Sequence, residues 1–504
     1  MPRRTASSTA PGHAVVLGSS LAGLFAAVAL ARHVDTVTIV ERDRLPEGPE
    51  WRRGVPQARH AHNLMTAGHR AMEELLPGIY RELVDAGMVE VSMSADLLLL
   101  SAGGWMPRFS TGLVMLTGSR DVIDWAVRQR VRADPRISLL TETEAIGLVG
   151  DERDGDTVVR GVAVRPRDPA APGGWGDERT IHADFVIDAT GRTSRAPEWL
   201  RALGFRPPAE TVVDAQTAYS TCVFDPPAGH AADWKCLLLQ YSPQKPVQGI
   251  LNPIEHGRWM VSLAALGGRQ PPADSEGFLA FARDLRSPVL YDVLRDARPV
   301  TPIHRSGRTE NRRRHYEKLR RWPDRFLVLG DAAGALNPSY GQGMSVAACS
   351  ALAVEAALSS AGSLEGIASG LRRDVARCIN LAWSISATAD LAYPWAADGA
   401  GLATRMLLRY LYRVIAASPT SRAASRAMLD INQMVAPPQA VLRPRVLAAA
   451  IRGTRRPPVA GAPPAPSGAS SHQSLGSSLA GEQGTASAQM TPGTDAAVTW
   501  RNRP

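Results

Sequence analysis

The residues that decide the fold read AVVLGSSLAG at positions 14–23 and VTIVE at positions 37–41. The first four, Ala14–Leu17, form a short apolar run that ends at a glycine, as a buried parallel strand does before a tight turn. Apolar residues then recur three and four apart over Leu21–Ala29, which predicts a helix with one buried face. A second apolar run, Val37–Val40, predicts another strand. Together these segments predict one βαβ unit of a Rossmann-like domain.

The turn between the first strand and the helix has the spacing of a dinucleotide-binding fingerprint. Gly18 and Gly23 stand at its ends, and Ser20 replaces the middle glycine. The first glycine allows the tight turn, the last lets helix and strand pack closely, and a small middle residue lets the backbone approach a pyrophosphate at the helix N-terminus. Glu41 lies roughly 20 residues downstream, where an acid accepts both hydroxyls of an adenosine ribose. The alternative is a pair of ordinary turn glycines.

Two later motifs also follow apolar strands and narrow the predicted cofactor to FAD. Asp188-Ala-Thr-Gly-Arg192 follows a strand that begins at Asp184, and Gly330-Asp331 follows Phe326–Leu329. Asp331 would accept a hydrogen bond from a ribityl hydroxyl, since ligands bind at the carboxyl ends of parallel strands. A bare loop then leads to a helix N-terminus that can stabilise negative charge on a reduced flavin. The loop residues predicted to contact the flavin are Pro338, Gly341, Gly343 and Met344. Without the other motifs, Gly330-Asp331 would indicate only a routine strand-to-helix turn with the aspartate as a cap.

These motifs, spread from about position 14 to 350, resemble the FAD-dependent monooxygenases of the para-hydroxybenzoate hydroxylase superfamily. The stretches ERDRLPEGPEWRRGVPQARHAH (41–62) and DATGRTSRAPEWL (188–200) are similar to actinobacterial flavin epoxidases of polyether antibiotic pathways. The resemblance implies FAD, NAD(P)H as a transient reductant, molecular oxygen, and a C4a-hydroperoxyflavin that epoxidises a polyene, polyketide or terpenoid alkene. It also implies that the FAD is contacted by Arg42, Arg52, Arg53 and Arg120.

Two departures from the pattern leave alternatives open. Ser20 replaces a glycine, and the middle motif reads Asp-Ala-Thr-Gly where aromatic hydroxylases have Asp-Gly, which puts the usual NADPH contact there in doubt. Aromatic hydroxylation is the main alternative to epoxidation. Prenyl reductases and halogenases share the scaffold, although the W-x-W-x-I-P motif typical of flavin halogenases is absent from the sequence. A flavoprotein without catalytic activity, serving as a scaffold, is a third class.

No Ser/His/Asp set or carboxylate pair is apparent, so the flavin is expected to carry the chemistry. His60 and His62 are candidates for orienting substrate or flavin, the alternative being solvated loop histidines. The β-rich stretch 218–265 is predicted to form an inserted sheet that walls a dry substrate cavity. Its predicted wall residues, which could equally be plain sheet core, are Phe224, Trp234, Leu237–Leu239, Ile250, Trp259 and Met260.

Other conspicuous residues have plainer interpretations. The basic run Arg308–Arg321 is predicted to be a solvated surface segment, with attraction of NADPH phosphates as the alternative. Trp383, Tyr393 and Trp395 are predicted to pack in a core or lid rather than to form a stacking platform.

Composition limits the class of protein. The net charge of +9 invites a nucleic-acid role, but there are only three lysines and the arginines are scattered, so no nucleic-acid partner is expected. The four cysteines are far apart, which argues against a metal site or a disulfide framework. No uninterrupted apolar run approaches the roughly 18 residues of a membrane span. We therefore expect a cytoplasmic enzyme, a monomer or homodimer, acting on a small molecule.

The predicted fold is α/β: a Rossmann-like FAD-binding domain with an inserted antiparallel substrate-binding sheet and a C-terminal helical region. The expected organisation is a flexible N-terminus (1–12), an FAD-binding domain (13–205 and 300–360), a β-rich domain (206–299), a helical region (361–452) and a disordered tail (453–504).

Overall fold

The computed structural model describes residues 12–153, 156–307, 309–397, 401–452 and 461–465. Nearly all of the predicted flexible N-terminus and disordered tail lies outside the described residues. The helices are α1 (Leu21–Leu30), α2 (Thr66–Leu75), α3 (Ile79–Asp85), α4 (Arg120–Arg132), α5 (Ala196–Ala202), α6 (Ser275–Arg283), α7 (Val289–Leu294), α8 (Gly343–Ala361), α9 (Ala368–Asp390), α10 (Leu402–Ala417), α11 (Arg422–Asn432) and α12 (Pro444–Arg452).

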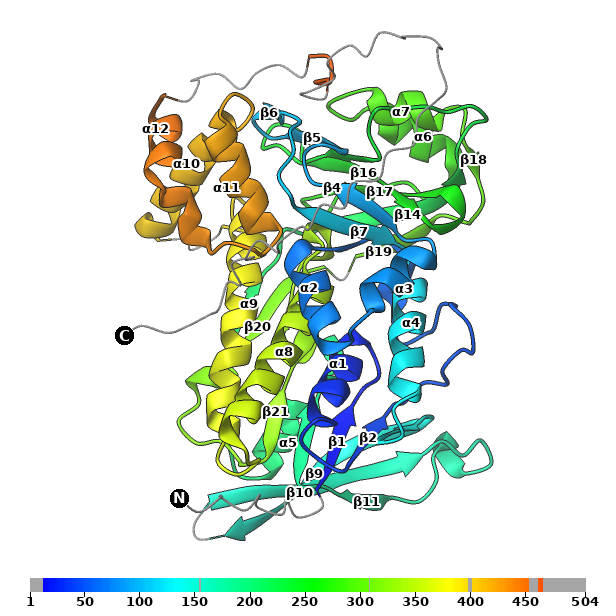
Figure 1. The fold of residues 1–504 in the computed structure, drawn as a ribbon, viewed down its shortest axis with the longest axis vertical. Coiled ribbons are helices and arrows are strands. Elements are labelled where there is room, and N and C mark those ends of the chain that lie inside the picture. Colours follow the sequence, from blue (N-terminus) through cyan, green and yellow to red (C-terminus); the bar gives the residue numbers. More distant parts are fainter. Residues whose placement is uncertain (1–11, 154–155, 308, 398–400, 453–460, 466–504) are drawn as a thin grey trace, which may run out of the picture. The chain divides into compact units, whose positions relative to one another are not determined.

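A five-stranded parallel sheet carries the predicted βαβ unit (Figure 1). Its strands, in spatial order, are β21 (Phe326–Val328), β12 (Phe185–Asp188), β1 (His13–Leu17), β2 (Thr36–Val40) and β8 (Ile137–Leu140). Each predicted apolar strand is present, with Val15 opposite Val186 on one side and Thr38 on the other. Strands β1, β12 and β21 are buried almost throughout, as their continuous apolar runs require.

The core of this domain lies between the parallel sheet and two sets of elements that pack with it, a group of helices and an antiparallel sheet. Helices α1, α4 and α8 contribute to one buried cluster with the sheet. The same cluster includes Val159, Val162 and Val164 of an antiparallel sheet made of β9 (Thr143–Arg153), β10 (Asp156–Pro166) and β11 (Arg179–His182). Helix α8 is long and apolar enough to cross a membrane by length and composition, but half of that window is buried inside the protein. A buried core helix passes the same test.

An eight-stranded sheet forms the second large layer. Its strands are β18 (Arg298–Pro299), β14 (Ala218–Asp225), β17 (Arg258–Ala265), β16 (Val247–Ile254), β15 (Cys236–Leu239), β5 (Leu97–Ser101) and β6 (Gly104–Trp105), with β19 (His304–Ser306) on β14. The sheet therefore extends beyond the predicted range 206–299, and the pairing of β5 with β15 is parallel, not antiparallel. Helices α6 and α7 cover one face of it.

Two small sheets complete the β structure of the described residues. One joins β3 (His62–Leu64), β7 (Val114–Gly118) and β4 (Val89–Ser92), and the other joins β13 (Glu210–Val213), β20 (Asn311–Arg314) and β22 (Gly334–Ala335).

The prediction of a solvated surface segment over 308–321 is wrong in its central part. Arg313 is only 1% exposed and lies on β20, the middle strand of its sheet. Its guanidinium pairs with Glu317, and Arg314 pairs with Glu210. These two arginines have a structural role because their charges are neutralised. The partner of Arg313 lies four residues along the chain, and the partner of Arg314 is distant in the sequence.

Candidate cofactor and substrate site

Three glycines stand where no side chain fits. A Cβ on Gly23 would lie 1.8 Å from the carbonyl oxygen of Gly18, so helix α1 and its preceding turn touch through bare backbone. Gly18 has φ +93° and approaches the backbone of Ala189. Gly330 has φ +63° and lies against Ala22. Such positions favour glycine because positive φ and close approach both exclude a Cβ.

The three predicted motifs meet at one edge of the parallel sheet. The Ala189 N–H donates to the Leu17 carbonyl at 2.9 Å, and the Leu329 N–H donates to the Asp188 carbonyl at 2.9 Å. The carboxyl ends of β1, β12 and β21 are therefore neighbours. This is the edge at which open α/β sheets bind ligands.

Glu41 is buried at the end of β2 and is held by internal donors. Ser19 donates its N–H and hydroxyl to Glu41 Oε2 at 2.8 and 2.7 Å, Arg52 lies 3.1 Å from the same oxygen, and the Asp43 N–H donates to Oε1. Burial acts to raise the pKa of Glu41, but Arg52 and these hydrogen bonds outweigh it and hold the pKa below its usual value. The carboxylate is thus ionised at neutral pH and is an acceptor for hydroxyl groups.

Arg120 joins the first turn to helix α4. Its Nη2 donates to the hydroxyl of Ser20 at 2.9 Å, and its Nε donates to Asp124 at 2.7 Å. The predicted Arg120 therefore lies at the fingerprint turn. Arg42 and Arg53 are exposed and form no hydrogen bond or ion pair with a described residue, so their contact with the cofactor stays a prediction.

The two aspartates at the strand ends differ in environment. Asp188 is fully buried and accepts hydrogen bonds from Thr190 and from the Ser194 hydroxyl, which fold the 188–194 turn back onto its strand. Asp331 makes no side-chain hydrogen bond within the described parts of the chain. Burial raises the pKa of Asp331, while Arg192, Arg120 and Arg312 act in the opposite direction. Asp331 can therefore accept a hydrogen bond from a ligand.

The loop before α8 presents a buried amide without a partner. Gln342 precedes the first residue of α8 and is 1% exposed, yet neither Oε1 nor Nε2 of its side chain has a hydrogen-bond partner among the described residues. Of the predicted loop residues, Met344 is buried, Pro338 and Gly343 are exposed, and Gly341 has φ +69°. A buried amide with no partner costs about 1–3 kcal/mol, so Gln342 suits a ligand with polar edges.

A buried carboxylate that the sequence reasoning missed anchors this loop. Asp390, the last residue of α9, is 0% exposed. It accepts hydrogen bonds from Asn311 Nδ2 at 2.6 Å, Asn337 Nδ2 at 3.0 Å and the Tyr340 hydroxyl at 2.7 Å. Asn337 and Tyr340 lie on either side of the Pro338-Ser339 pair, so helix α9 fixes the loop through one side chain. No local motif marks Asp390, because its partners lie about 50 and 80 residues away in the sequence.

The segment 60–65 links the loop to the large sheet. His60 Nδ1 lies 2.9 Å from the Thr221 hydroxyl on β14, and Asn63 Oδ1 accepts from Asn252 Nδ2 on β16 at 2.7 Å. At the other end, the Met65 N–H donates to Ser345 of α8 at 3.2 Å. Residues 60–65 therefore lie between the predicted cofactor loop and the predicted substrate sheet.

His60 is only 5% exposed, so the alternative of a solvated loop histidine is wrong for it. Burial lowers the pKa of both His60 and His62 to about 3, helped by nearby positive groups, while the hydrogen bond that the His62 ring donates to the His60 carbonyl partly opposes the shift at His62. Both rings are neutral at pH 7. They are suited to orienting a ligand and poorly suited to accepting a proton from it.

The predicted wall residues lie on both faces of the large sheet. Those on one face pack with helices α6 and α7 as ordinary core, which corrects the wall prediction for Phe224, Trp234, Leu237, Leu239 and Trp259. Strand alternation places the others, Leu238, Ile250 and Met260, on the opposite face. Leu238 there joins an apolar cluster made of Met65, Val91, Met93, Leu97, Leu113, Met115, Cys236 and Leu429, with Leu99, Phe109 and Val435 packed against it.

This methionine cluster touches the cofactor loop. The Met65 methyl carbon lies 3.0 Å from where a Cβ on Gly341 would be. At the edge of the cluster, the Arg422 guanidinium lies over the ring of Phe109, 5.5 Å from the ring centroid. The main members of the cluster are buried, and the flexible, polarisable methionines among them allow such a core to repack.

Two of the remaining aromatic candidates, Trp383 and Tyr393, pack internally, whereas Trp395 is 41% exposed. Tyr393 is buried and stacks on Trp395 with ring centroids 5.3 Å apart, and Trp395 donates to the Ala215 carbonyl. Trp383 packs against the main core. The four cysteines are free, and no group of His, Cys, Asp and Glu within the described ranges could hold a metal ion.

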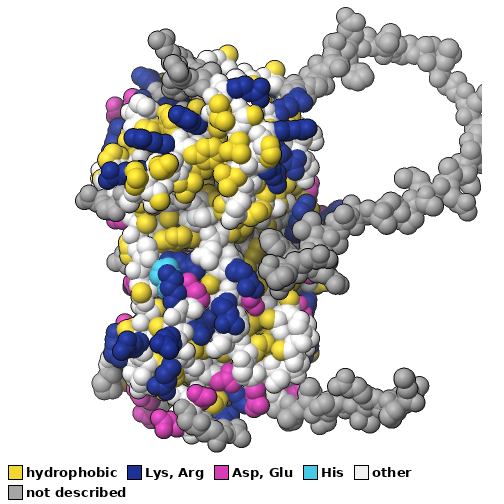
Figure 2. All heavy atoms as spheres, turned by 90° about the vertical axis from the view of Figure 1, so that its left-hand side faces the viewer, with side chains coloured by type: hydrophobic (Ala, Val, Ile, Leu, Met, Phe, Trp, Pro, Cys, Tyr) yellow, Lys and Arg dark blue, Asp and Glu magenta, His cyan; other side chains and the backbone are white. Residues whose placement is uncertain are grey.

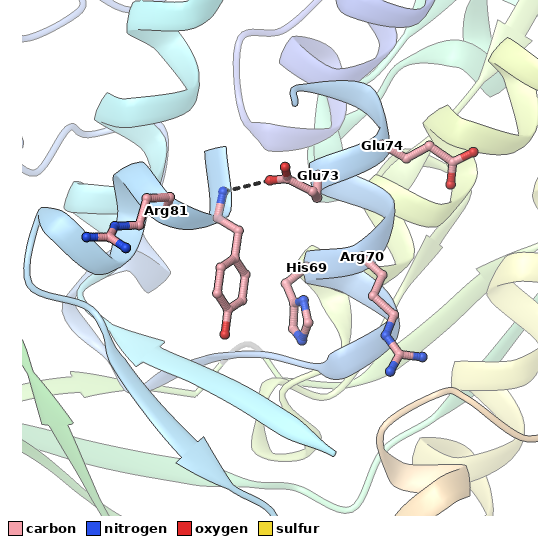
Figure 3. A pocket seen from close by; sticks show the side chains of 6 residues that line it. His69, Arg70, Glu73, Glu74 and Arg81 are labelled. Atoms are coloured by element: carbon pink, nitrogen blue, oxygen red, sulfur yellow. Dashed lines mark hydrogen bonds between the residues drawn. The ribbon is translucent and has the colours of Figure 1, made fainter. Parts of the chain in front are cut away.

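A separate surface hollow of about 510 Å³ lies between α2 and α3 (Figure 3). Its lining is charged and polar, and Glu73 accepts a hydrogen bond from the Tyr80 N–H across it. None of the predicted cofactor residues lines it.

The fold is that of the flavin-dependent monooxygenases and halogenases of the para-hydroxybenzoate hydroxylase type. The chain is similar to flavin-dependent brominase Bmp2 (TM-score 0.61, 14% identity, 87% of this chain and 98% of the other), to the flavin-dependent halogenase CmlS (0.56, 18%, 90% and 74%) and to p-nitrophenol 4-monooxygenase PnpA from Pseudomonas putida DLL-E4 (0.56, 16%, 84% and 98%). No known protein-family model matches the sequence.

The chain belongs to the same family as Protein Rv3254 of Mycobacterium tuberculosis. The two are 32% identical over 389 residues, which cover 76% of this chain and 80% of that relative.

Proposed function

We propose that the protein is an FAD-dependent monooxygenase that uses NAD(P)H and molecular oxygen to epoxidise an apolar alkene in specialised metabolism. The observation that carries the proposal is the meeting of the Gly18 turn, Glu41 and Asp331 at one edge of the parallel sheet. The residues present fit the cofactor: Gly23 leaves a bare backbone at the turn, the Asp331 carboxylate is open to a ligand, and the amide of Gln342 is buried without a partner.

Each of these residues would hold a different part of the cofactor. Glu41 would accept the adenosine ribose hydroxyls, the N-terminus of α1 with Ser20 and Arg120 would bind the pyrophosphate, and Asp331 would accept a ribityl hydroxyl. The N-terminus of α8, with Gln342 beside it, would face the polar edge of the ring system. When bound, FAD would supply the redox chemistry and the activation of oxygen.

The choice of an alkene rests on the methionine cluster. The apolar, methionine-rich side chains beside Gly341 would suit an apolar substrate better than a charged one. The cluster's aliphatic side chains would hold a flexible apolar chain and exclude water, while His60 and His62 would orient the substrate as neutral groups. Aromatic hydroxylation stays the alternative, and Phe109 at the edge of the cluster is the observation that favours it.

Two of the similar structures are named as halogenating enzymes, but the positions of the lysines disfavour halogenation for this chain. Flavin halogenases typically use a lysine in the active site. Here Lys235 pairs with Asp96, Lys245 pairs with Asp284, and Lys318 is exposed. Lys245 and Lys318 do not contact the described residues that form the candidate site, and Lys235, which precedes Cys236 of the methionine cluster, is exposed and held by Asp96 and the Glu90 carbonyl.

The test combines cofactor binding with product analysis. The purified protein is expected to be yellow, to consume NAD(P)H and to add one oxygen atom from isotopically labelled O₂ to an apolar alkene. A matched pair of variants serves as control: Gly23→Ala should lose both FAD and activity, whereas Gly370→Ala, where a Cβ meets nothing within 4 Å, should keep them.

Other outcomes would point elsewhere. A product that gains two hydrogens would replace the proposal with a reductase, and incorporation of halide would replace it with a halogenase. A colourless protein that takes up no added FAD would overturn the proposal altogether.

A further inference from the structure

The C-terminal helices carry an exposed apolar and basic face. On α10 the residues that point outward recur at helical spacing, and several large apolar ones are strongly exposed. Leu402 is 75% exposed, Met406 62%, Leu407 47% and Tyr412 38%, and Ile451 at the end of α12 is 78% exposed. Large apolar side chains that gather on one surface mark an interaction site. Figure 2 shows hydrophobic side chains gathered on this side of the molecule with Lys and Arg among them.

The packing of the inner face of α10 explains why its outer face is exposed. Val414 and Ala417 pack against α11 and α12 in one small core, and Tyr410 and Leu411 pack on a second. The inward stripe is therefore already satisfied by neighbouring helices. The outward stripe, which begins at Leu402, is an additional apolar surface that folding of this region does not require.

The charge of the region is strongly one-sided. Residues 401–452 contain eight arginines and one aspartate, with no lysine or glutamate, a net charge of +7. Three of the arginines, Arg405, Arg409 and Arg413, lie on α10 and are exposed. None of the three forms an ion pair with a residue in the described part of the chain. The single aspartate, Asp430, already pairs with Arg426 and Arg443.

We propose that α10 docks the protein on a membrane surface that contains anionic phospholipid. A helix with exposed Leu and Met among arginines lies in the plane of a lipid interface, with the apolar side chains among the acyl chains and the guanidinium groups at the phosphates. A protein partner would need a groove that is both acidic and apolar. An anionic membrane presents negative phosphates and apolar acyl chains over its whole surface. The proposal is independent of the flavin chemistry, although docking there would give the enzyme access to apolar substrates dissolved in lipid.

The experiment measures binding of the full-length, FAD-treated protein to vesicles by flotation. The protein is expected to float with vesicles of phosphatidylcholine mixed with phosphatidylglycerol, to stay behind with phosphatidylcholine alone, and to be released by high salt. Replacing Arg405, Arg409 and Arg413 by Gln should lower the partition coefficient roughly 100-fold at low ionic strength. A second variant with Leu402→Ser and Met406→Ser should lose binding without losing charge.

The matched control replaces three exposed arginines elsewhere, Arg195, Arg201 and Arg206, by Gln, which should leave binding unchanged. Equal loss in the control would show a general charge effect and overturn the proposal. So would an absence of flotation with the anionic vesicles. A dimer in light scattering that Met406→Ser dissociates, without vesicle binding, would assign the face to a second copy of this chain instead.

Discussion

Asp390 offers a sharp test of how the predicted flavin loop is held. Burial raises the pKa of Asp390 to about 6, although hydrogen bonds from Asn337, Tyr340 and Asn311 oppose the shift. Between pH 4 and 6 the folded protein therefore holds a proton that the unfolded chain releases. The free energy of unfolding falls as pH rises through this window, because the folded state binds the extra proton. A shift of about two units corresponds to about 3 kcal/mol.

Two substitutions separate the charge from the hydrogen bonds. Asp390→Asn removes the titration, so the variant should lack this fall of about 3 kcal/mol between pH 4 and 7. Asp390→Ala also removes the acceptor of three buried donors, from Asn311, Asn337 and Tyr340. Each orphaned donor costs about 1–3 kcal/mol, so Asp390→Ala should be destabilised by at least about 3 kcal/mol and should release FAD more readily.

The assay is urea unfolding of the wild type and both variants across this pH range. The free energy of unfolding of each variant is compared with that of the wild type at the same pH, so that the contributions of other titrating groups cancel. Asp296→Asn, which removes an exposed carboxylate, is the control and should follow the wild type. Parallel pH curves for the wild type and Asp390→Asn would refute the reasoning, and so would an Asp390→Ala protein with unchanged stability and FAD affinity.

Three other predictions concern the cofactor edge. Gly23→Ala should lower FAD affinity at least about 100-fold in a fluorescence titration, because its Cβ would lie 1.8 Å from the Gly18 carbonyl oxygen; an unchanged Kd would contradict the close approach. Glu41→Ala should lower the free energy of unfolding by about 1–3 kcal/mol in urea, because it leaves the buried Ser19 donors without an acceptor, while Arg52 keeps Asp43 at 3.3 Å as a partner. Gln342→Leu should raise the Kd for FAD about tenfold while leaving the cofactor-free protein at least as stable, because its buried amide has no internal partner; a destabilised cofactor-free protein would count against this view.

The sequence by itself determined the parts of the protein that local chemistry dictates. Continuous apolar runs predicted the buried parallel strands, and the spacing of Gly18 and Gly23 predicted a turn in which a side chain has no room. The position of Asp331 directly after a strand predicted where its carboxylate would lie. These features depend on neighbours close in the chain, so their patterns can be read without knowing the rest of the fold.

Only the tertiary structure decided features that depend on distant partners. Alternation along β15 shows that Leu237 and Leu238 face opposite ways, but which face α6 and α7 cover is set by packing. Burial of Arg313 and of Asp390 depends on groups brought together by the fold, the Ala376 carbonyl for Arg313 and the Asn311 amide for Asp390. A buried charge or amide is tolerated only where such partners converge, and their convergence is a property of the folded chain that no local spacing records.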